Sequence, residues 1–597
     1  MPDEEQSPQR SDARALAGAR LIAGFVQGLA LYLLYSAYDA QAWPAKQGEI
    51  FAPLLMISLF IPLPVNQGLG NLRPRTLVLW IIAAAILLAG LAGYDIWRAW
   101  PEQDHWINGV RWVGPPVLPS FPLVFFGAAG LFIAHVLVSG GDADRRWRAT
   151  YPTHFDVAWK FGVQLALSAA FTGALWLLLW LGSELFELIN LNFLEKLIEH
   201  EWFSIPLTTL AVAMALHITD VRAGLVRGAR TLTLVLLSWL LPLMALFAVG
   251  FFAALPFTGL EPLWKTKTAA SLLLIAAGAL VILINAAYQD GENEHHSVPL
   301  VLRYAARAAA LVLVPVTLLA AYAIFLRVRQ YGWTMERVSS AVVAAIALGY
   351  AGGYAWAAVK PGAWLREIQP WNFVMSLAAL AGLFAVFTPL LDPARISVSD
   401  QMARLQRGTV TPQAFDFTFL HRADRFGYTA LTDLKQHGRT QYVRSMAANT
   451  LAPSQDIFAP ATSASIAADI AVFPRGRVLP ANFLKQVWKP GAEMPACLTV
   501  QGALCDARFA DLDGDGKDEL ILYPAIGQYP ITPFVFAEDA GGHWTVVGTL
   551  NVPSSCSAAG TALRGGPLAI VAPQQRWHDL EAGGTRVRFV PLDSCKP

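Results

Sequence analysis

The sequence predicts an all-α polytopic membrane bundle of about 11 transmembrane helices, followed by a C-terminal soluble α+β domain with a small antiparallel β part. Composition supports this fold class: of 597 residues, 55% are hydrophobic and 15% are charged, and the mean hydropathy is +0.44. Ordinary soluble domains carry roughly 25% charged residues. The long apolar runs stop after Leu391, which places the end of the membrane part near Asp392-Pro393.

The predicted spans are apolar segments of about 20 residues, long enough to cross the hydrocarbon core of a bilayer as helices. In chain order they are residues 20–38, 51–66, 77–94, 121–138, 161–186, 204–219, 231–256, 269–287, 309–326, 338–358 and 373–391. The second is the weakest, because Pro62 and Pro64 interrupt it. We therefore expect a membrane domain over 20–391, preceded by a cytoplasmic tail over 1–19.

Lysine and arginine in the short loops predict the orientation. A cytoplasmic N-terminus puts about 16 basic residues on the cytoplasmic side and about 9 on the other. An odd number of spans then exports the C-terminal part, although a change of one span in the count would reverse its side. The expected arrangement has a cytoplasmic N-terminus and an exported C-terminal domain.

The cysteines support the same orientation. All four lie in the soluble part, at Cys497, Cys505, Cys556 and Cys595. An even set confined to one small domain indicates disulfides, which persist in an oxidising compartment. Zinc is the alternative, but no pair has the close C-x₂₋₄-C spacing of common zinc sites. Among three possible pairings, the local one joins Cys497 to Cys505 and Cys556 to Cys595.

The soluble part divides into a helical and a strand-rich stretch. Residues 395–450 are predicted to be an extracytoplasmic helical segment whose last helix ends at Gly438, and 453–465 has the composition of a linker. Residues 466–597 are predicted to form a small β-rich domain, because short apolar runs alternate with Gly-containing turns. The predicted strands are residues 520–523, 534–536, 544–547 and 587–590.

One segment of the β-rich domain predicts a metal site. Residues 511–519 read Asp-Leu-Asp-Gly-Asp-Gly-Lys-Asp-Glu. The alternating carboxylates are hard oxygen ligands suited to Ca²⁺, and the glycines let the backbone turn tightly around an ion. The predicted ligands are four carboxylates and one main-chain carbonyl, namely Asp511, Asp513, Asp515, Glu519 and the carbonyl of Lys517.

This loop differs from an EF-hand, which needs a bidentate Glu at its twelfth position, where Leu522 stands. It resembles the calcium loops of FG-GAP-type repeats, which join two β-strands, with Glu519 where that family usually has Asp. A single unit excludes a full propeller within this chain. The alternative interpretation is an acidic turn without metal, because three close carboxylates repel one another. We expect a structural Ca²⁺.

Ionisable and polar groups in the spans are the first place to look for transport chemistry. Glu184 and Glu187 lie on one helix face and are candidates for a cation or proton entry site, although a helix end meeting water explains them as well. His135 and His217, near the cytoplasmic ends of two spans, and Asn285 are more typical of packing and interhelical hydrogen bonds.

Several stretches carry a family resemblance. They are Pro262-Leu263-Trp264, the run from Ile284 to Gly291, the Tyr331-Gly332-Trp333-Thr334 turn between two spans, and Phe417 to Leu434. Over roughly residues 15–440 the chain resembles the bacterial multi-pass membrane family catalogued as domain of unknown function 4153. The resemblance implies a helical inner-membrane protein, and it brings no established activity and no catalytic residues.

The sequence carries no nucleotide-binding, zinc-protease or hydrolase signature. Two hypotheses for function remain. The first is an envelope scaffold or sensor that displays a calcium-stabilised β domain to a periplasmic partner. The second is a transporter or a lipid- or glycan-handling enzyme with its site between the spans. A polar mid-membrane cavity reaching Glu184, Asn285 or His217 would favour the second. The net charge of +1 argues against a nucleic-acid partner, whereas the lipid bilayer is an expected one.

Overall fold

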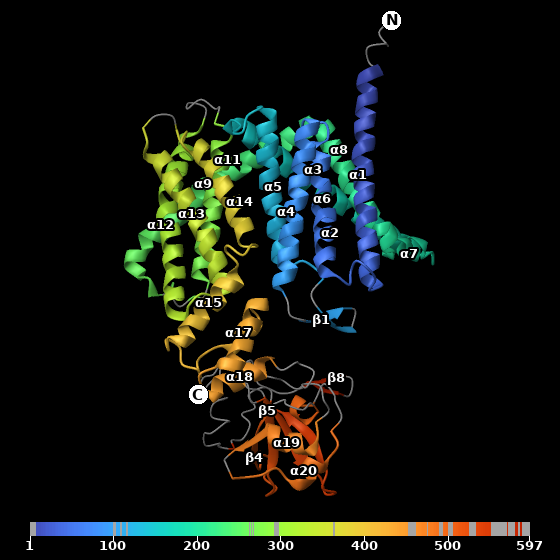
Figure 1. The fold of residues 1–597 in the computed structure, drawn as a ribbon, viewed down its shortest axis with the longest axis vertical. Coiled ribbons are helices and arrows are strands. Elements are labelled where there is room, and N and C mark those ends of the chain that lie inside the picture. Colours follow the sequence, from blue (N-terminus) through green and yellow to red (C-terminus); the bar gives the residue numbers. More distant parts are fainter. Residues whose placement is uncertain are drawn as a thin grey trace. The chain divides into compact units, whose positions relative to one another are not determined.

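The computed structural model describes residues 7–99, 103–107, 110–114, 117–261, 263, 266, 268–291, 298–361, 364–451, 461–473, 476–488, 494–499, 505–524, 533–550, 570, 580–582 and 585–587 (Figure 1). The chain forms two compact units, Met1–Thr450 and Leu451–Pro597. Cys556, Cys595, the predicted linker residues 453–460 and most of the predicted strand 587–590 lie outside the described residues.

The first unit is the predicted membrane bundle. Its described part contains 11 helical segments long and apolar enough to cross a bilayer. They are α1 (Ser7–Asp39), α2 (Gly48–Phe60) with α3 (Pro62–Gly68), α4 (Pro74–Arg98), α5 (Phe121–Ala143), α6 (Tyr151–Glu187), α8 (Glu201–Val221), α9 (Ala223–Thr258), α11 (Ala269–Tyr288), α12 (Leu300–Tyr331), α13 (Met335–Val359) and α14 (Ile368–Ala385). Two short elements join spans: the strand pair β1 (Gln103–Ile107) and β2 (Val110–Gly114), and helix α7 (Phe193–Glu199).

The interruption predicted in the second span is confirmed. Helix α2 ends at Phe60 and α3 begins at Pro62, which occupies the first turn of the new helix. A proline has no N–H to continue the hydrogen bonds of the preceding helix, but it fits the first helical position. The second span is therefore two helices in series.

Helix α12 lies at the centre of one half of the bundle, packed against α9, α11 and α13. Half of its most apolar window is buried, the largest buried share among the 11 spans. The buried face carries alanines at 306, 309, 310 and 320. Small side chains let the backbones of membrane helices approach closely, where van der Waals packing replaces the hydrophobic effect.

Glycines produce a close approach in the other half. A Cβ at Gly24 or Gly28 of α1 would lie 2.5 Å from Ala213 Cβ or 2.4 Å from Thr209 Oγ1, both on α8. Gly349 and Gly353 of α13 have the same four-residue spacing, and a Cβ at Gly353 would overlap the ring of Trp371 on α14. Both glycine pairs let neighbouring helices pack closely.

Four helices follow the last span within the first unit: α15 (Pro393–Gln406), α16 (Phe417–His421), α17 (Asp424–His437) and α18 (Gln441–Leu451). Gly438 ends a helix as predicted, and its N–H donates to the carbonyl of Leu434, but this helix is not the last one, because α18 follows it. The helical character expected for residues 395–450 is thus observed.

The second unit contains a five-stranded sheet in the order β3-β4-β5-β6-β7. Its strands are β3 (Ile470–Phe473), β4 (Cys505–Ala510), β5 (Glu519–Pro524), β6 (Phe534–Glu538) and β7 (Trp544–Thr549), with α19 (Ser463–Asp469), α20 (Ala481–Lys485) and a 3₁₀ turn, η2 (Ala496–Leu498), before β4. A separate antiparallel pair joins β8 (Leu580–Ala582) to β9 (Thr585–Val587). Three predicted strands correspond to β5, β6 and β7.

The sheet is mixed, whereas a purely antiparallel one was predicted. Strands β4 to β7 pair antiparallel, but β3 pairs parallel to β4. Parallel neighbours need a long crossover, and residues 474–504 supply it between these two strands. Neither β3 nor β4 was predicted: β3 is only four residues long, and β4 reads Cys-Asp-Ala-Arg-Phe-Ala, without the β-branched residues typical of strands.

Aromatic rings and a disulfide form the core of this unit. Phe483 of α20 lies with its ring centroid 5.8 Å from that of Phe536 and 5.7 Å from that of Trp544. The predicted disulfide between Cys497 and Cys505 is present and buried, with the two Cα atoms 6.0 Å apart. It ties η2 to the first residue of β4, the strand that leads into the acidic loop.

Candidate metal centre and buried polar sites

The acidic loop connects two central strands of the sheet. Ala510, the last residue of β4, pairs with Glu519, the first residue of β5, so residues 511–518 form the turn of a hairpin. Asp511, Asp513 and Glu519 each place one carboxylate oxygen so that the three atoms lie within 4.8 Å of one another. The hairpin geometry thus brings together three of the five predicted ligand residues.

Asp511 organises the turn. Its Oδ1 accepts a hydrogen bond from the N–H of Gly514 at 2.7 Å, and its Oδ2 accepts one from Gly516 at 3.0 Å. Both glycines have positive φ, +80° and +87°, a conformation that disfavours residues with a Cβ. The alternation of Asp and Gly is therefore required to wind the backbone around this carboxylate.

Glu519 closes the loop from the buried side. Its side chain is buried, and its Oε2 accepts a hydrogen bond from the N–H of Leu512 at 2.6 Å. The other two predicted ligands lie outside the three-carboxylate group. Asp515 Oδ1 accepts a hydrogen bond from the N–H of Lys517 at 2.7 Å, and both residues are exposed.

The donor set of this loop fits a hard divalent cation. Carboxylate and carbonyl oxygens are the ligands that Ca²⁺ prefers, and its coordination number leaves room for water. Three carboxylates in such proximity repel one another, and a bound cation relieves that repulsion. Each has an oxygen or lone pair left after its backbone hydrogen bond. The loop offers charge and geometry for binding an ion.

The polar residues singled out in the spans have separate environments. Glu184 and Glu187 are exposed at the end of α6. His135 is buried, accepts a hydrogen bond at Nδ1 from Trp80 Nε1 at 3.0 Å, and stacks on Phe161. His217 lies 3.4 Å from Arg20 and makes no contact with His135. The two histidines therefore have packing and ion-cluster environments, and they do not form a pair.

Asn285 of α11 forms the interhelical hydrogen bonds expected of it. Its Nδ2 donates to the hydroxyl of Tyr354 on α13 at 2.6 Å, and its Oδ1 accepts from Asn372 on α14 at 2.7 Å. Tyr354 in turn donates to Asn372 Oδ1 at 2.7 Å, and Tyr151 of α6 donates to Asn285 Oδ1 at 3.3 Å. This network joins four spans near their ends.

A cavity of about 530 Å³ lies beside this network, between α5, α6, α11 and α14. It reaches Asn285, but Glu184 and His217 do not line it. Asn285 is three residues before the end of α11, and Tyr151 is the first residue of α6. The cavity therefore lies near the ends of the spans on the side of the N-terminus, and not in their middle.

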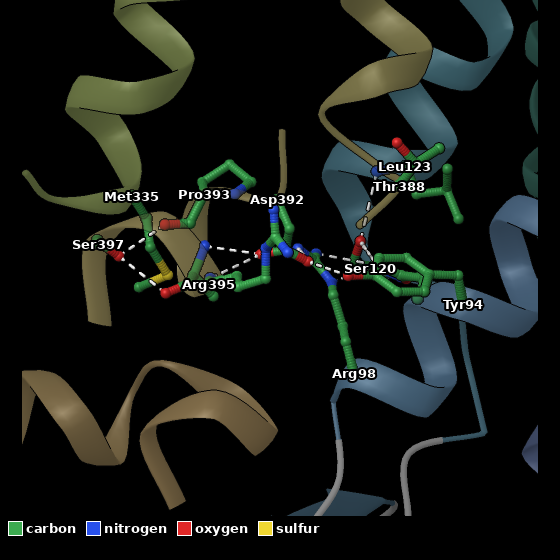
Figure 2. Close-up of polar contacts among 12 residues, drawn as sticks. Tyr94, Arg98, Ser120, Leu123, Met335, Thr388, Asp392, Pro393, Arg395 and Ser397 are labelled. Atoms are coloured by element: carbon green, nitrogen blue, oxygen red, sulfur yellow. Dashed lines mark hydrogen bonds and ion pairs between the residues drawn. The ribbon is translucent and has the colours of Figure 1, made fainter. Parts of the chain in front are cut away.

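A buried ionic cluster at the opposite ends of the spans joins α4 to the last span. Asp392 is fully buried, and its Oδ2 lies 3.6 Å from Arg98 and accepts a hydrogen bond from Tyr94 at 2.9 Å (Figure 2). Arg98 also pairs with Asp95 at 3.0 Å. Asp95 in turn accepts hydrogen bonds from the N–H and the hydroxyl of Ser120, which caps α5.

The same carboxylate caps α15, the first of the helices that follow the membrane part. Asp392 Oδ1 accepts hydrogen bonds from the N–H groups of Ala394 and Arg395, the N-cap geometry of α15 (Figure 2). An N-cap aspartate satisfies free N–H groups and interacts favourably with the helix dipole. One signal for this role is in the sequence, because Asp-Pro is a typical start of a helix.

The Tyr331-Gly332-Trp333-Thr334 turn holds the other side of α15. Asp400 Oδ2 accepts a hydrogen bond from the Trp333 N–H at 2.8 Å, and Gln401 donates to the carbonyls of Tyr331 and Trp333. Gly332 has a φ of +78°, and a Cβ there would lie 2.6 Å from Asp400 Oδ2. This stretch of the family resemblance is thus a docking site for α15.

A second ion cluster lies on the side of the N-terminus. Arg20 of α1 is fully buried, pairs with Asp220 of α8 at 2.6 Å, and donates to the carbonyl of Leu69 at 2.6 Å. Lys160 of α6 pairs with the other oxygen of Asp220 at 2.8 Å. Two cations around one carboxylate hold three spans together. Because these residues are far apart in the sequence, no spacing rule connects them.

Comparison with known proteins gives one match. The family model described as Domain of unknown function (DUF4153) matches residues 51–434, which confirms the family and much of the extent expected from the sequence. No curated protein and no solved structure matches the chain.

The carboxyl of Asp424, at the start of α17, should make the stability of the fold depend on pH. Burial raises its pKa to about 6; Arg98 opposes the rise, and Asp392 and Asp95 add to it. In the unfolded chain the pKa of this carboxyl is near its ordinary value of 3.8, so the folded chain holds the proton more tightly. The free energy of unfolding therefore falls as pH rises from about 4 to about 6. We expect Asp424→Asn to raise the melting temperature of the full chain by about 2 °C at pH 7.5, with the gain vanishing towards pH 4.

The matched control is Asp433→Asn, an exposed carboxylate on the same helix that contacts only His437 among the described residues. Thermal melts of the purified chain across this pH range provide the comparison. A gain for Asp424→Asn that is equal at pH 4 and pH 7.5, or shared by the control, would contradict the assignment.

Proposed function

The chain belongs to the DUF4153 family of multi-pass membrane proteins, and from this premise we propose that it displays a calcium-stabilised β domain on the periplasmic side of the bacterial inner membrane. In this role the bundle is the anchor, and the β domain binds or senses an envelope partner. The observation that carries the proposal is the group of three carboxylate oxygens within 4.8 Å, between two central strands.

The orientation is supported by three independent features. The excess of basic residues in loops on the N-terminal side favours a cytoplasmic N-terminus. The described residues contain 11 candidate spans, an odd number, which supports opposite sides for the start of the chain and the segment after α14. The buried disulfide Cys497–Cys505 suits an oxidising compartment such as the periplasm.

A calcium ion bound in the loop would stabilise the sheet, because the loop joins two of its central strands. The hairpin of β4 and β5 is internal to the five-stranded sheet, with β3 on one side and β6 on the other. An ion held by Asp511, Asp513 and Glu519 would clamp the two strands at one end. Because a ligand that binds only the folded form stabilises it, calcium would keep the domain in its binding-competent state.

The second hypothesis, a site between the spans, has one observation in its favour. The cavity beside Asn285 is large enough for a small ligand and combines polar with apolar walls. Its position near the span ends supports a binding site at one membrane surface more than a path through the bilayer.

The orientation can be tested by fusions in vivo. Alkaline phosphatase fused after Ser465 should be active, because it folds only where its disulfides form, whereas a fusion after Gly291 should be inactive. Activity measured in whole cells, normalised to the amount of fusion protein, reads the side of each junction. The opposite pattern would contradict both the orientation and the periplasmic assignment of the β domain.

The metal site can be tested on the full-length chain in detergent. We expect calorimetric titration to detect one Ca²⁺ per chain and calcium to slow amide hydrogen exchange in peptides from residues 505–524. Asp513→Ala should weaken binding by about tenfold or more, because it removes one of few charged ligands.

The matched control for this test is Asp518→Ala in the same loop. Asp518 lies outside the three-carboxylate group and pairs with Arg477 at the surface. An exposed pair of this kind contributes little, so the control should keep its calcium affinity. Equal exchange of residues 505–524 in calcium and in chelator would show that the loop is an acidic turn without metal.

A further inference from the structure

The cavity between α5, α6, α11 and α14 has an uneven distribution of charge. Arg148 lies at one end, with its guanidinium 5.1 Å from the centroid of the Phe373 ring. Among the described residues, no carboxylate oxygen lies within 4.0 Å of this guanidinium. Arg145 and Arg146 are exposed in the same loop. This end of the cavity is therefore cationic.

The nearest acid in the sequence, Asp144, is engaged elsewhere. It accepts hydrogen bonds from the N–H of Thr150 at 2.6 Å and from the hydroxyl of Thr153 at 2.8 Å. The hydrogen bond from the Thr150 N–H holds the pKa of Asp144 below its ordinary value. The carboxylate thus caps the start of α6 and leaves Arg148 to an anion from outside the chain.

Other groups around this end also suit an anionic ligand. Helices α6 and α14 both begin here, at Tyr151 and Ile368, and helix N-termini carry partial positive charge. His154 lines the cavity, and neither of its ring nitrogens has a hydrogen-bond partner among the described residues. A buried polar atom without a partner costs free energy, which a polar ligand beside the ring would reduce.

Asn285, Gln369, Asn372 and Ser376 also line the cavity, and much of the rest of its wall is apolar and belongs to spans. Phe132 of α5, Phe155 and Trp159 of α6 and Phe373 of α14 give the cavity a largely aromatic wall. A free inorganic anion would gain nothing from these rings. A molecule with an anionic head and a hydrocarbon tail would contact both ends. Trp147, exposed beside Arg148, is the amphipathic type of side chain that favours the lipid–water interface.

We propose that this cavity binds an anionic phospholipid, with the lipid phosphate at Arg148 and the upper part of an acyl chain against the aromatic wall. Basic pockets between membrane helices are the general form of such sites. The lipid would fill the space between α5, α6 and α14 and would tie the start of α6 and of α14 to the end of α5. The inference goes beyond the proposed display of a β domain and does not depend on it.

Native mass spectrometry of the full-length chain tests the site, with dioleoyl phosphatidylglycerol and dioleoyl phosphatidylcholine as probes. We expect the first phosphatidylglycerol molecule to bind more tightly than any further phosphatidylglycerol molecules. It should also bind more tightly than phosphatidylcholine. Arg148→Gln should weaken this binding by about tenfold, and Arg146→Gln, in the same loop but outside the cavity lining, by less than about threefold. An excess of glycerol 3-phosphate should not displace the lipid.

A measurement on the wild-type chain covers the case in which Arg148→Gln fails to fold. Phosphatidylglycerol should slow amide hydrogen exchange in residues 144–160 relative to phosphatidylcholine. Equal exchange in both lipids, or equal losses for the two arginine variants, would overturn the site. Displacement by glycerol 3-phosphate would replace the lipid with a soluble phosphate as the ligand and would also overturn the proposal.

Discussion

One fully buried carboxylate, that of Asp392, sets the geometry at the end of the membrane bundle. Its Oδ2 accepts a hydrogen bond from Tyr94 and pairs with Arg98, both of α4. Its Oδ1 accepts hydrogen bonds from the first N–H groups of α15. A buried charge is tolerated only when it is paired and hydrogen-bonded, so these partners must stay in place together. The end of the last span, the end of α4 and the start of α15 are thereby held in one arrangement. Helix α17 contacts α4 beside it, through Arg425 and Phe426 against Trp97.

The two ends of the bundle use different means of attachment. At the Asp392 end, ion pairs and the Tyr331-Gly332-Trp333-Thr334 turn dock the helices that follow the spans. At the other end, Arg20, Asp220 and Lys160 join three spans, and an amide network centred on Asn285 joins four. Between them the spans meet through alanine and glycine faces. The ion pairs of these two clusters lie near the span ends, where the bilayer penalty for charge is smallest.

The parts of the fold that depend on local sequence were predictable. Hydropathy over about 20 residues reveals each span, and the Asp-Gly alternation at 511–519 identifies the loop. The parts that depend on distant contacts were not. Tyr94 and Asp392 are 298 positions apart, and no spacing rule joins them. The parallel pairing of β3 and the cavity beside Asn285 likewise arise only when separate elements pack. Of the predicted ligands, the turn brings together Asp511, Asp513 and Glu519, whereas the hydrogen bond from the Lys517 N–H to Asp515 Oδ1 could not be read from the spacing.

The most direct test of the role of Asp392 is thermal melting of the full-length chain with Asp392→Asn and Asp392→Ala. Removing one partner of a buried ion pair costs roughly 3–5 kcal/mol, and the asparagine retains an oxygen that can cap α15. We therefore predict both variants to melt below the wild type, with alanine lowest, and faster amide exchange in residues 393–406. Wild-type melting and exchange in Asp392→Ala would contradict the account.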